Sequence, residues 1–194
     1  MNAHAPPARE VSTRDPQTST VNAPSRILVV FYSRSETTAE FAGRLAGELD
    51  ADYERLQEVE FQRRKGPLGF LLSILDVVYK RPSHLQPMTH RLDDYDVVLI
   101  GTPVWAARAS ASVATWLSLH SHQLRTVAFF CTMGARGSED AFAQMQRLAR
   151  RAPIATCAIS ARDMRADAAV EKVSRFVLAI KDVLAAREHE AAAR

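Results

Sequence analysis

Residues 27–49 open with an apolar run, continue through Tyr32-Ser33-Arg34-Ser35-Glu36-Thr37-Thr38, and end in an amphipathic segment. The apolar run, from Ile27 to Phe31, is nearly continuous and rich in large aliphatic side chains, which is typical of a buried central strand. In the amphipathic part, apolar residues recur at spacings of three and four, which predicts a helix over 37–49. The unit is therefore a strand, a polar turn and a helix.

The turn at residues 33–38, which we call the hydroxyl turn, carries four hydroxyl side chains: Ser33, Ser35, Thr37 and Thr38. The first amides of a helix lack acceptors within the helix, and the helix dipole is positive at that end. Such a place suits a phosphate. Because the turn lacks the glycines of a dinucleotide-binding loop or a Walker loop, the pattern favours a monophosphate.

A purely structural interpretation of the same residues fits the turn alone equally well. Thr37 followed by Glu40 matches a capping box, in which a hydroxyl and a carboxylate satisfy the first amides of the helix internally. Only residues elsewhere in the chain can separate these two interpretations.

The composition predicts one globular domain, since 47% of the 194 residues are hydrophobic and 24% are charged. We place this domain at residues 25–187. A polar, proline-containing extension at 1–24, which we expect to be disordered, precedes it, and a frayed tail at 188–194 follows it. Cys131 and Cys157 lie in apolar runs, which predicts buried free thiols in a reducing compartment.

Several patterns that the sequence lacks indicate where the protein is located in the cell and which partners it does not bind. The start of the chain lacks the basic and apolar regions of a secretory signal, and no stretch reaches the roughly 18 apolar residues of a spanning helix. We therefore expect a cytoplasmic protein. The formal charge of +3 and pI near 9.1 come without a lysine-rich or aromatic-basic pattern, so we expect no nucleic-acid partner.

Four further runs predict strands over 52–56, 95–102, 126–131 and 154–159, and helical spacing lies between and after them. The last helix has Val170, Val173, Val177, Ile180 and Leu184 on its expected inner face. This alternation predicts the α/β class, with a doubly wound, five-stranded parallel sheet covered by helices on both faces.

One segment, which begins at Leu68 and ends at Tyr79, is apolar on nearly all sides of a helix. We interpret it as a crossover helix whose outer face is covered. A homodimer contact, a lid over a hydrophobic substrate and a membrane-surface segment are the alternatives.

Ligands of an open α/β sheet bind at the carboxyl ends of the strands, where the strand order reverses. Three loops leave such ends here: the hydroxyl turn, residues 102–108 and residues 132–138. The second contains Trp105, whose flat indole beside a phosphate site suits a phosphorylated planar ring system. Taken alone, a tryptophan in a loop is more often a packing anchor for a helix, but together with the hydroxyl turn the cofactor interpretation becomes the better one.

Three segments resemble the cofactor loops of the flavodoxin family: residues 32–38, residues 94–106 and residues 129–134. They occur in the family's order, and the resemblance spans about residues 26–185. It implies a flavodoxin-like three-layer sandwich with strand order 2-1-3-4-5 and FMN as the cofactor.

The resemblance also implies roles for individual residues. The phosphate would be held by Ser33, Arg34, Ser35, Glu36, Thr37 and Thr38, the isoalloxazine would be lined by Thr102, Pro103, Val104, Trp105 and Ala106, and its pyrimidine side would be bordered by Thr132, Met133 and Gly134. Trp105 would stack on the ring. The motif supplies no catalytic acid, base or metal ligand, and we assign none.

Glu36 departs from the family pattern, which has glycine at this place. At about 6 Å and an effective dielectric constant near 20, each pair of like unit charges between Glu36 and a phosphate would cost about 3 kcal/mol, and Arg34 could offset part of it. Two functions therefore stand side by side. The first is an FMN-binding redox protein, either an NAD(P)H- or quinone-linked oxidoreductase or an electron-transfer protein, with a protein or a small molecule as redox partner. The second is a flavodoxin-like scaffold with weak or lost FMN binding that acts through protein contacts.

Overall fold

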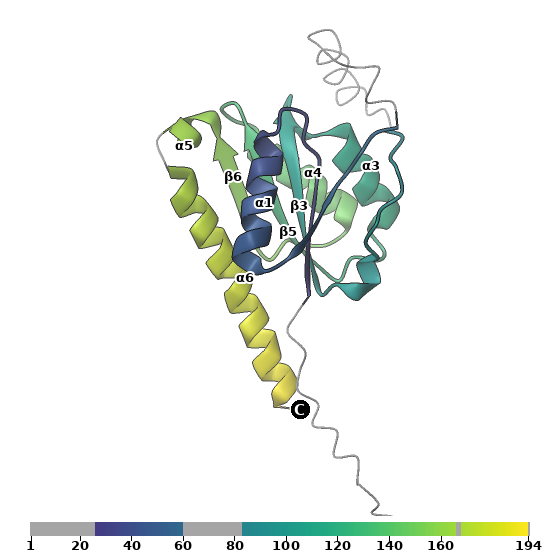
Figure 1. The fold of residues 1–194 in the computed structure, drawn as a ribbon, viewed down its shortest axis with the longest axis vertical. Helices are drawn as coiled ribbons and strands as arrows, with labels where there is room; N and C mark the ends of the chain where they lie inside the picture. Colours follow the sequence, from purple (N-terminus) through teal and green to yellow (C-terminus); the bar gives the residue numbers. More distant parts are fainter. Residues whose placement is uncertain (1–25, 60–82, 166–167, 194) are drawn as a thin grey trace, which may run out of the picture.

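The computed structural model describes residues 26–59, 83–165 and 168–193. Within them, a parallel sheet lies between two layers of helices (Figure 1). The expectations for the extension at 1–24 and for the segment from Leu68 to Tyr79 fall outside the described residues. Over the described ranges, none of the helices combines the length and apolar content that crossing a bilayer requires.

The described residues form a six-stranded sheet, of which five strands are parallel in the order β2-β1-β3-β5-β6. The strands are β1 (Ile27–Phe31), β2 (Asp52–Arg55), β3 (Val97–Trp105), β4 (Arg108–Ala109), β5 (Thr126–Met133) and β6 (Thr156–Ser160). The predicted parallel sheet and its order are confirmed, since β5 and β6 are the fourth and fifth parallel strands. The short β4 is an addition that pairs antiparallel with the end of β3.

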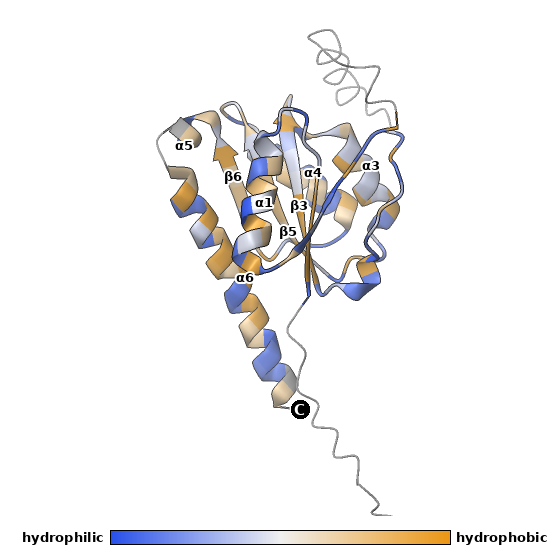
Figure 2. Cartoon of the chain, viewed as in Figure 1, coloured by the Kyte–Doolittle hydropathy of each residue, from blue (hydrophilic) through white to orange (hydrophobic). Residues whose placement is uncertain are grey.

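Helices cover both faces of this sheet (Figure 1). One face packs against α1 (Thr37–Leu49) and α6 (Ala168–Ala192), and the other against α3 (Ala111–His120) and α4 (Ser138–Ala149). The 3-10 helix η2 (Leu92–Asp94) precedes β3, and α5 (Ala161–Arg165) follows β6. Figure 2 shows hydrophobic residues concentrated in the strands and mixed with hydrophilic ones along the helices.

The residues of β1 alternate between these two layers, because successive side chains of a strand point to opposite faces. Val29 and Phe31 pack in the cluster that includes α1 and α6, whereas Leu28 and Val30 pack in the cluster that includes α3 and α4. Every residue of the strand is buried. A strand covered on both sides is apolar throughout, which is why the run at 27–31 could be identified.

Some boundaries differ from those expected. The last helix continues past the domain end expected at residue 187, to Ala192. The prediction for Val170 is wrong, because this side chain is 48% exposed, whereas Val173, Val177, Ile180 and Leu184 are buried. The inward stripe of α6 begins at Ala169, which is 7% exposed, and the neighbouring residue therefore points away from the core.

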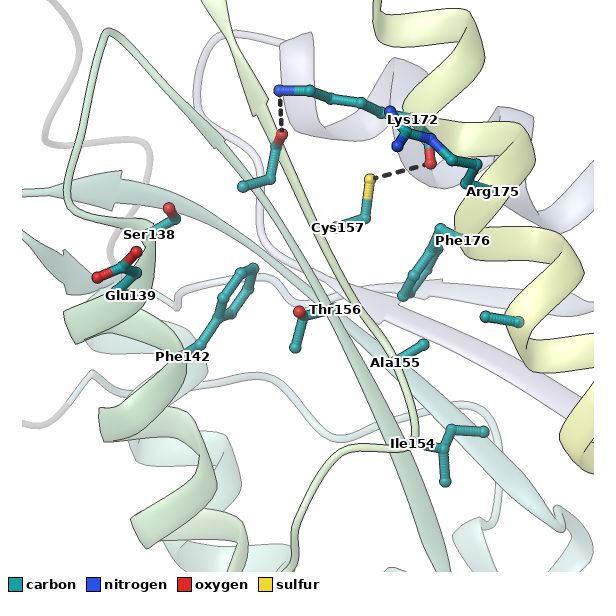
Figure 3. Close-up of a pocket in the computed structure, with 12 residues that line it drawn as sticks. Ser138, Glu139, Phe142, Ile154, Ala155, Thr156, Cys157, Lys172, Arg175 and Phe176 are labelled. Carbon is teal, nitrogen blue, oxygen red and sulfur yellow. Dashed lines mark hydrogen bonds between the residues drawn. The ribbon is translucent and has the colours of Figure 1, made fainter.

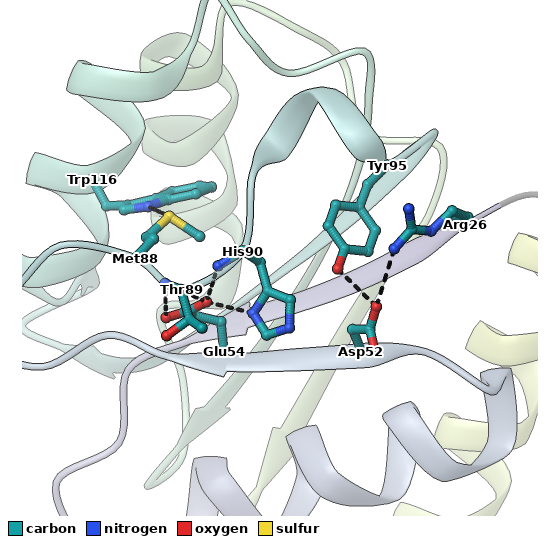
Figure 4. A network of polar contacts seen from close by, with 8 residues as sticks. All are labelled: Arg26, Asp52, Glu54, Met88, Thr89, His90, Tyr95 and Trp116. Atoms are coloured by element: carbon teal, nitrogen blue, oxygen red, sulfur yellow. Dashed lines mark hydrogen bonds and ion pairs between the residues drawn. The ribbon is translucent and has the colours of Figure 1, made fainter.

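The two edges of the sheet differ. Residues 84–86 run beside residues 57–59, which follow β2. The Glu54 carboxylate of β2 accepts hydrogen bonds from the amides of Thr89 (2.9 Å) and His90 (2.9 Å) and contacts the His90 ring (Figure 4). Burial acts to raise the pKa of Glu54, but these hydrogen bonds outweigh it and hold the pKa below its usual value. Beside the outer edge of β6, no strand is present among the described residues.

We expect Gly101→Ala to destabilise the fold. Gly101 is the β3 partner of both Phe31 and Phe130, and an added Cβ would lie 2.0 Å from Cζ of the buried Phe130 ring. Overpacking of this kind costs about 1–3 kcal/mol, which urea denaturation would measure as a loss in the free energy of unfolding.

Gly43→Ala is the matched control, because an added Cβ there meets no atom within 4 Å. This exposed position of α1 should gain about 0.5–1 kcal/mol in the free energy of unfolding. Equal stability of the two variants would contradict the close packing of Gly101 against Phe130.

Candidate functional site

The carboxyl ends of β1, β3 and β5 bring the three predicted loops together. Thr38 and Thr132 share a buried hydrogen bond of 2.7 Å between their Oγ1 atoms, which joins the hydroxyl turn to the third loop. The Tyr32 and Trp105 rings meet edge to face with centroids 6.3 Å apart, which joins the first strand to the second loop. The second and third loops meet at Gly137, since a Cβ there would lie 2.8 Å from Ala107 Cα.

The hydroxyl turn leaves the first amides of α1 open. The helix begins at Thr37, and its N-cap residue is Glu36, whose side chain makes no capping hydrogen bond. The capping-box interpretation is therefore wrong, because Thr37 lies inside the helix. Ser33 Oγ accepts a hydrogen bond from the Ala39 amide at 3.2 Å, whereas the amides of Thr37 and Thr38 have no acceptor within the helix.

Glu36 has a left-handed backbone, with φ of 62°. This conformation costs a residue other than glycine roughly 1–2 kcal/mol, so the glycine expected here from the resemblance would adopt it without that cost. The side chain points to β2, where both carboxylate oxygens accept hydrogen bonds from Arg55 at 2.7 and 3.0 Å. These hydrogen bonds lower the pKa of Glu36. The carboxylate therefore has a counter-charge within the chain.

Arg55 is the functional candidate that the sequence did not reveal. Its Nη2 also donates a hydrogen bond to the Ser33 carbonyl at 2.8 Å, so one guanidinium holds both ends of the segment 33–36. The parallel register places Arg55 opposite Phe31, the last residue of β1. A polar residue at the end of a short strand belongs to no recognisable sequence motif. Only the pairing register of β1 with β2 could have indicated that Arg55 lies beside the hydroxyl turn.

The second segment is the end of a strand and a hairpin, not the loop expected at 102–108. β3 continues through Trp105, and β4 turns back antiparallel, with Trp105 opposite Arg108. The two turn residues, Ala106 and Ala107, have φ of 48° and 58°. Two successive left-handed residues make the tight turn whose twist matches a hairpin, and here it forms without glycine or asparagine.

The residues predicted to line a flavin differ in their exposure to solvent. Thr102, Pro103 and Val104 are buried, whereas Trp105 is half-buried and Ala106 is exposed. Thr102 Oγ1 accepts a hydrogen bond from the Ser110 amide at 2.9 Å, so its hydroxyl closes the hairpin. Trp105 and Ala106 are therefore the residues of this segment that remain accessible to a ligand.

In the third segment, β5 runs two residues further than expected, through Met133. Thr132 is buried against Thr38, and Met133 packs beside the small cluster of Val104 and Cys131. Gly134 is exposed at the rim. Both cysteines are buried free thiols, as predicted.

A cavity of about 600 Å³ lies beside the hydroxyl turn on the β2 side, within the usual range of small-molecule sites. Its walls include Tyr32, Ser33, Glu36, Arg55 and Glu58. Burial and the nearby Glu58 charge raise the pKa of Tyr32 to about 12, so the phenol stays protonated at neutral pH. Neither the hairpin nor the third loop lines this cavity.

A second cavity, of about 580 Å³, lies along the outer side of β6 between α4 and α6 (Figure 3). Phe142 from α4 and Phe176 from α6 line it, and Lys172 Nζ donates to the Ala158 carbonyl of the strand at 3.4 Å. Lys172 also pairs with Asp163 at 2.8 Å. None of the predicted site residues lines this cavity.

Comparisons with solved structures identify the fold. A Lactobacillus acidophilus flavoprotein in complex with FMN matches with 21% identity and a TM-score of 0.61, over 73% of this chain and 97% of that one. A Fusobacterium nucleatum flavodoxin bound to FMN matches with 8% identity and a TM-score of 0.54, over 81% and 98%. No protein-family model and no curated protein matches the sequence.

A rubredoxin oxygen:oxidoreductase from Desulfovibrio gigas is also similar, with 13% identity and a TM-score of 0.52, over 83% of this chain and 36% of that one. The chain therefore has a flavodoxin-like fold, as the resemblance implied.

We expect Gly137→Ala to weaken the contact between the hairpin and the third loop. Gly137 has φ of 102°, and the added Cβ would collide with Ala107 Cα. The free energy of unfolding in urea should fall by at least about 1 kcal/mol. Gly134→Ala, where an added Cβ meets nothing within 4 Å, should leave it within about 0.5 kcal/mol. Similar losses in both variants would show that the Gly137 contact is not the cause.

Proposed function

We propose that this protein binds FMN at the carboxyl ends of β1, β3 and β5 and acts as a redox flavoprotein. The observation that carries the proposal is the open first turn of α1, with Trp105 held close by through Tyr32. The FMN named in two of the solved neighbours supports the same ligand class. One end of the sheet would then offer FMN both an anion site and an aromatic platform.

The residues of the hydroxyl turn fit a phosphate, but they have different roles. Ser33 is 2% exposed and caps the Ala39 amide, so it shapes the turn. Ser35 is exposed and Thr37 half-buried, and within the described ranges neither hydroxyl has a hydrogen-bond partner. We assign the phosphate contacts to these two hydroxyls and to the amides of Thr37 and Thr38. Arg34 and Glu36 flank the phosphate.

The flavin ring would lie against Trp105 and Ala106, with Thr132, Met133 and Gly134 at its pyrimidine side. FMN supplies one- and two-electron chemistry when bound. The chain's own contribution is to hold the phosphate, orient the ring and shield one face of it with the indole.

We propose a protein or a small-molecule electron acceptor as redox partner, and a cytoplasmic location in keeping with two free thiols. The mildly basic charge favours an enzyme over a carrier, because carriers of this kind use acidic surfaces to dock basic reductases. Steady-state oxidation of NAD(P)H with a quinone would support the enzyme. Electron exchange with a flavodoxin reductase, without turnover, would support the carrier.

The scaffold alternative depended on Glu36 repelling the phosphate. In the structure the Glu36 carboxylate is paired with Arg55, which removes the main argument for it. Titration of FMN with the purified protein tests the choice directly. Quenching of flavin fluorescence at micromolar protein is expected, and its absence would favour the scaffold.

Two variants should separate the phosphate site from the ring site when FMN and riboflavin are compared. Ser35→Ala with Thr37→Val removes hydrogen bonds to a charged group, so FMN affinity should fall about tenfold or more while riboflavin affinity stays unchanged. Trp105→Leu removes stacking, so both affinities should fall roughly 2- to 12-fold. Fluorescence titration measures each dissociation constant.

Ser118→Ala is the control for these variants, because Ser118 is exposed on α3 and its hydroxyl, among the described residues, donates to the Ala114 carbonyl of its own helix alone. It should change neither affinity. A loss of FMN and riboflavin binding to the same extent in the serine and threonine variant would contradict the assignment of the phosphate site.

A further inference from the structure

The hydroxyl turn holds a carboxylate at the position where the helix dipole attracts an anion. Glu36 is the N-cap of α1, and carboxylates at this position are favoured by the positive helix end. An unpaired Glu36 side chain would therefore compete with a phosphate for the same amides, and would repel it by charge.

The structure places the Glu36 side chain elsewhere. The side chain is 68% exposed and turned to β2, where it forms a two-point ion pair with Arg55. Isolated ion pairs at a surface contribute little, but this one is bidentate and is anchored by the third hydrogen bond, from Arg55 to the Ser33 carbonyl. The pairing of Arg55 with Phe31 between β2 and β1 fixes the backbone position of the arginine.

We propose that Arg55 is a positioning residue of the phosphate site, which holds the Glu36 carboxylate away from the first amides of α1 and neutralises its charge. This inference rests on the proposed function, since it concerns the same site. The paired Arg55 and Glu36 would thus keep the phosphate site open at the position where the family pattern has a single glycine. The guanidinium acts through Glu36 and the turn, not by contact with the phosphate.

A double-mutant cycle with FMN and riboflavin tests this role. Arg55→Met should weaken FMN binding at least tenfold and leave riboflavin binding unchanged, because the released carboxylate opposes only the phosphate. Glu36→Gln should leave FMN affinity unchanged or raise it. In the double variant, FMN affinity should return to within about threefold of the wild type, because no carboxylate remains to compete.

Arg44→Met is the matched control, since Arg44 pairs with Glu48 at 2.9 Å on the same helix, four residues apart. It removes the same charge and should change FMN affinity less than twofold. Arg55→Lys, which keeps the charge but loses the two-point geometry, should give an affinity between those of the wild type and Arg55→Met. Thermal denaturation checks that each variant is folded. If Arg55→Met does not fold, the cycle is completed with Arg55→Lys in its place, alone and combined with Glu36→Gln.

The outcomes separate the inference from the function beneath it. Wild-type protein that fails to quench FMN fluorescence overturns the proposed function and the inference with it. Wild-type binding with equal effects of Arg55→Met and Arg44→Met overturns the inference alone. A loss in Arg55→Met that Glu36→Gln does not restore also overturns it, since Arg55 would then act on the phosphate directly.

Discussion

The parallel pairing of β1 with β3 and of β3 with β5 is the constraint on which this protein depends. Because all three strands point the same way, the segments that leave them meet at one edge of the sheet. The Thr38–Thr132 hydrogen bond and the Tyr32–Trp105 contact are consequences of that register. Residues almost a hundred positions apart thereby share one small region.

Much of the fold could be predicted because strands buried on both sides leave a strong pattern. The runs at 27–31 and 126–131 are nearly all apolar, and their order along the chain with intervening helices allowed few topologies. The hairpin at 102–110 could not be predicted in the same way. Its turn uses Ala106 and Ala107 in left-handed conformations, and alanine gives no signal for such a turn.

The candidate site shows the same division. The hydroxyls at 33–38 and the indole of Trp105 are local features that can be identified from the residues themselves. The ion pair of Glu36 with Arg55 is not local, because it joins residues 19 positions apart through the pairing of β1 with β2. From the sequence, Glu36 was an obstacle to phosphate binding. In the structure it has a partner.

The two edges of the sheet differ in how well they are covered, and this affects association between molecules. At β2 the neighbouring segment and the Glu54 hydrogen bonds occupy the margin, whereas among the described residues β6 has only the flanking helices. An unpaired margin invites strands from other chains, and a lysine placed on it opposes this. Lys172, bonded to the Ala158 carbonyl, stands at that margin. Because Lys172 belongs to α6 and is also paired with Asp163, an added strand would have to displace it from that carbonyl, and the flanking helix thereby protects the β6 edge.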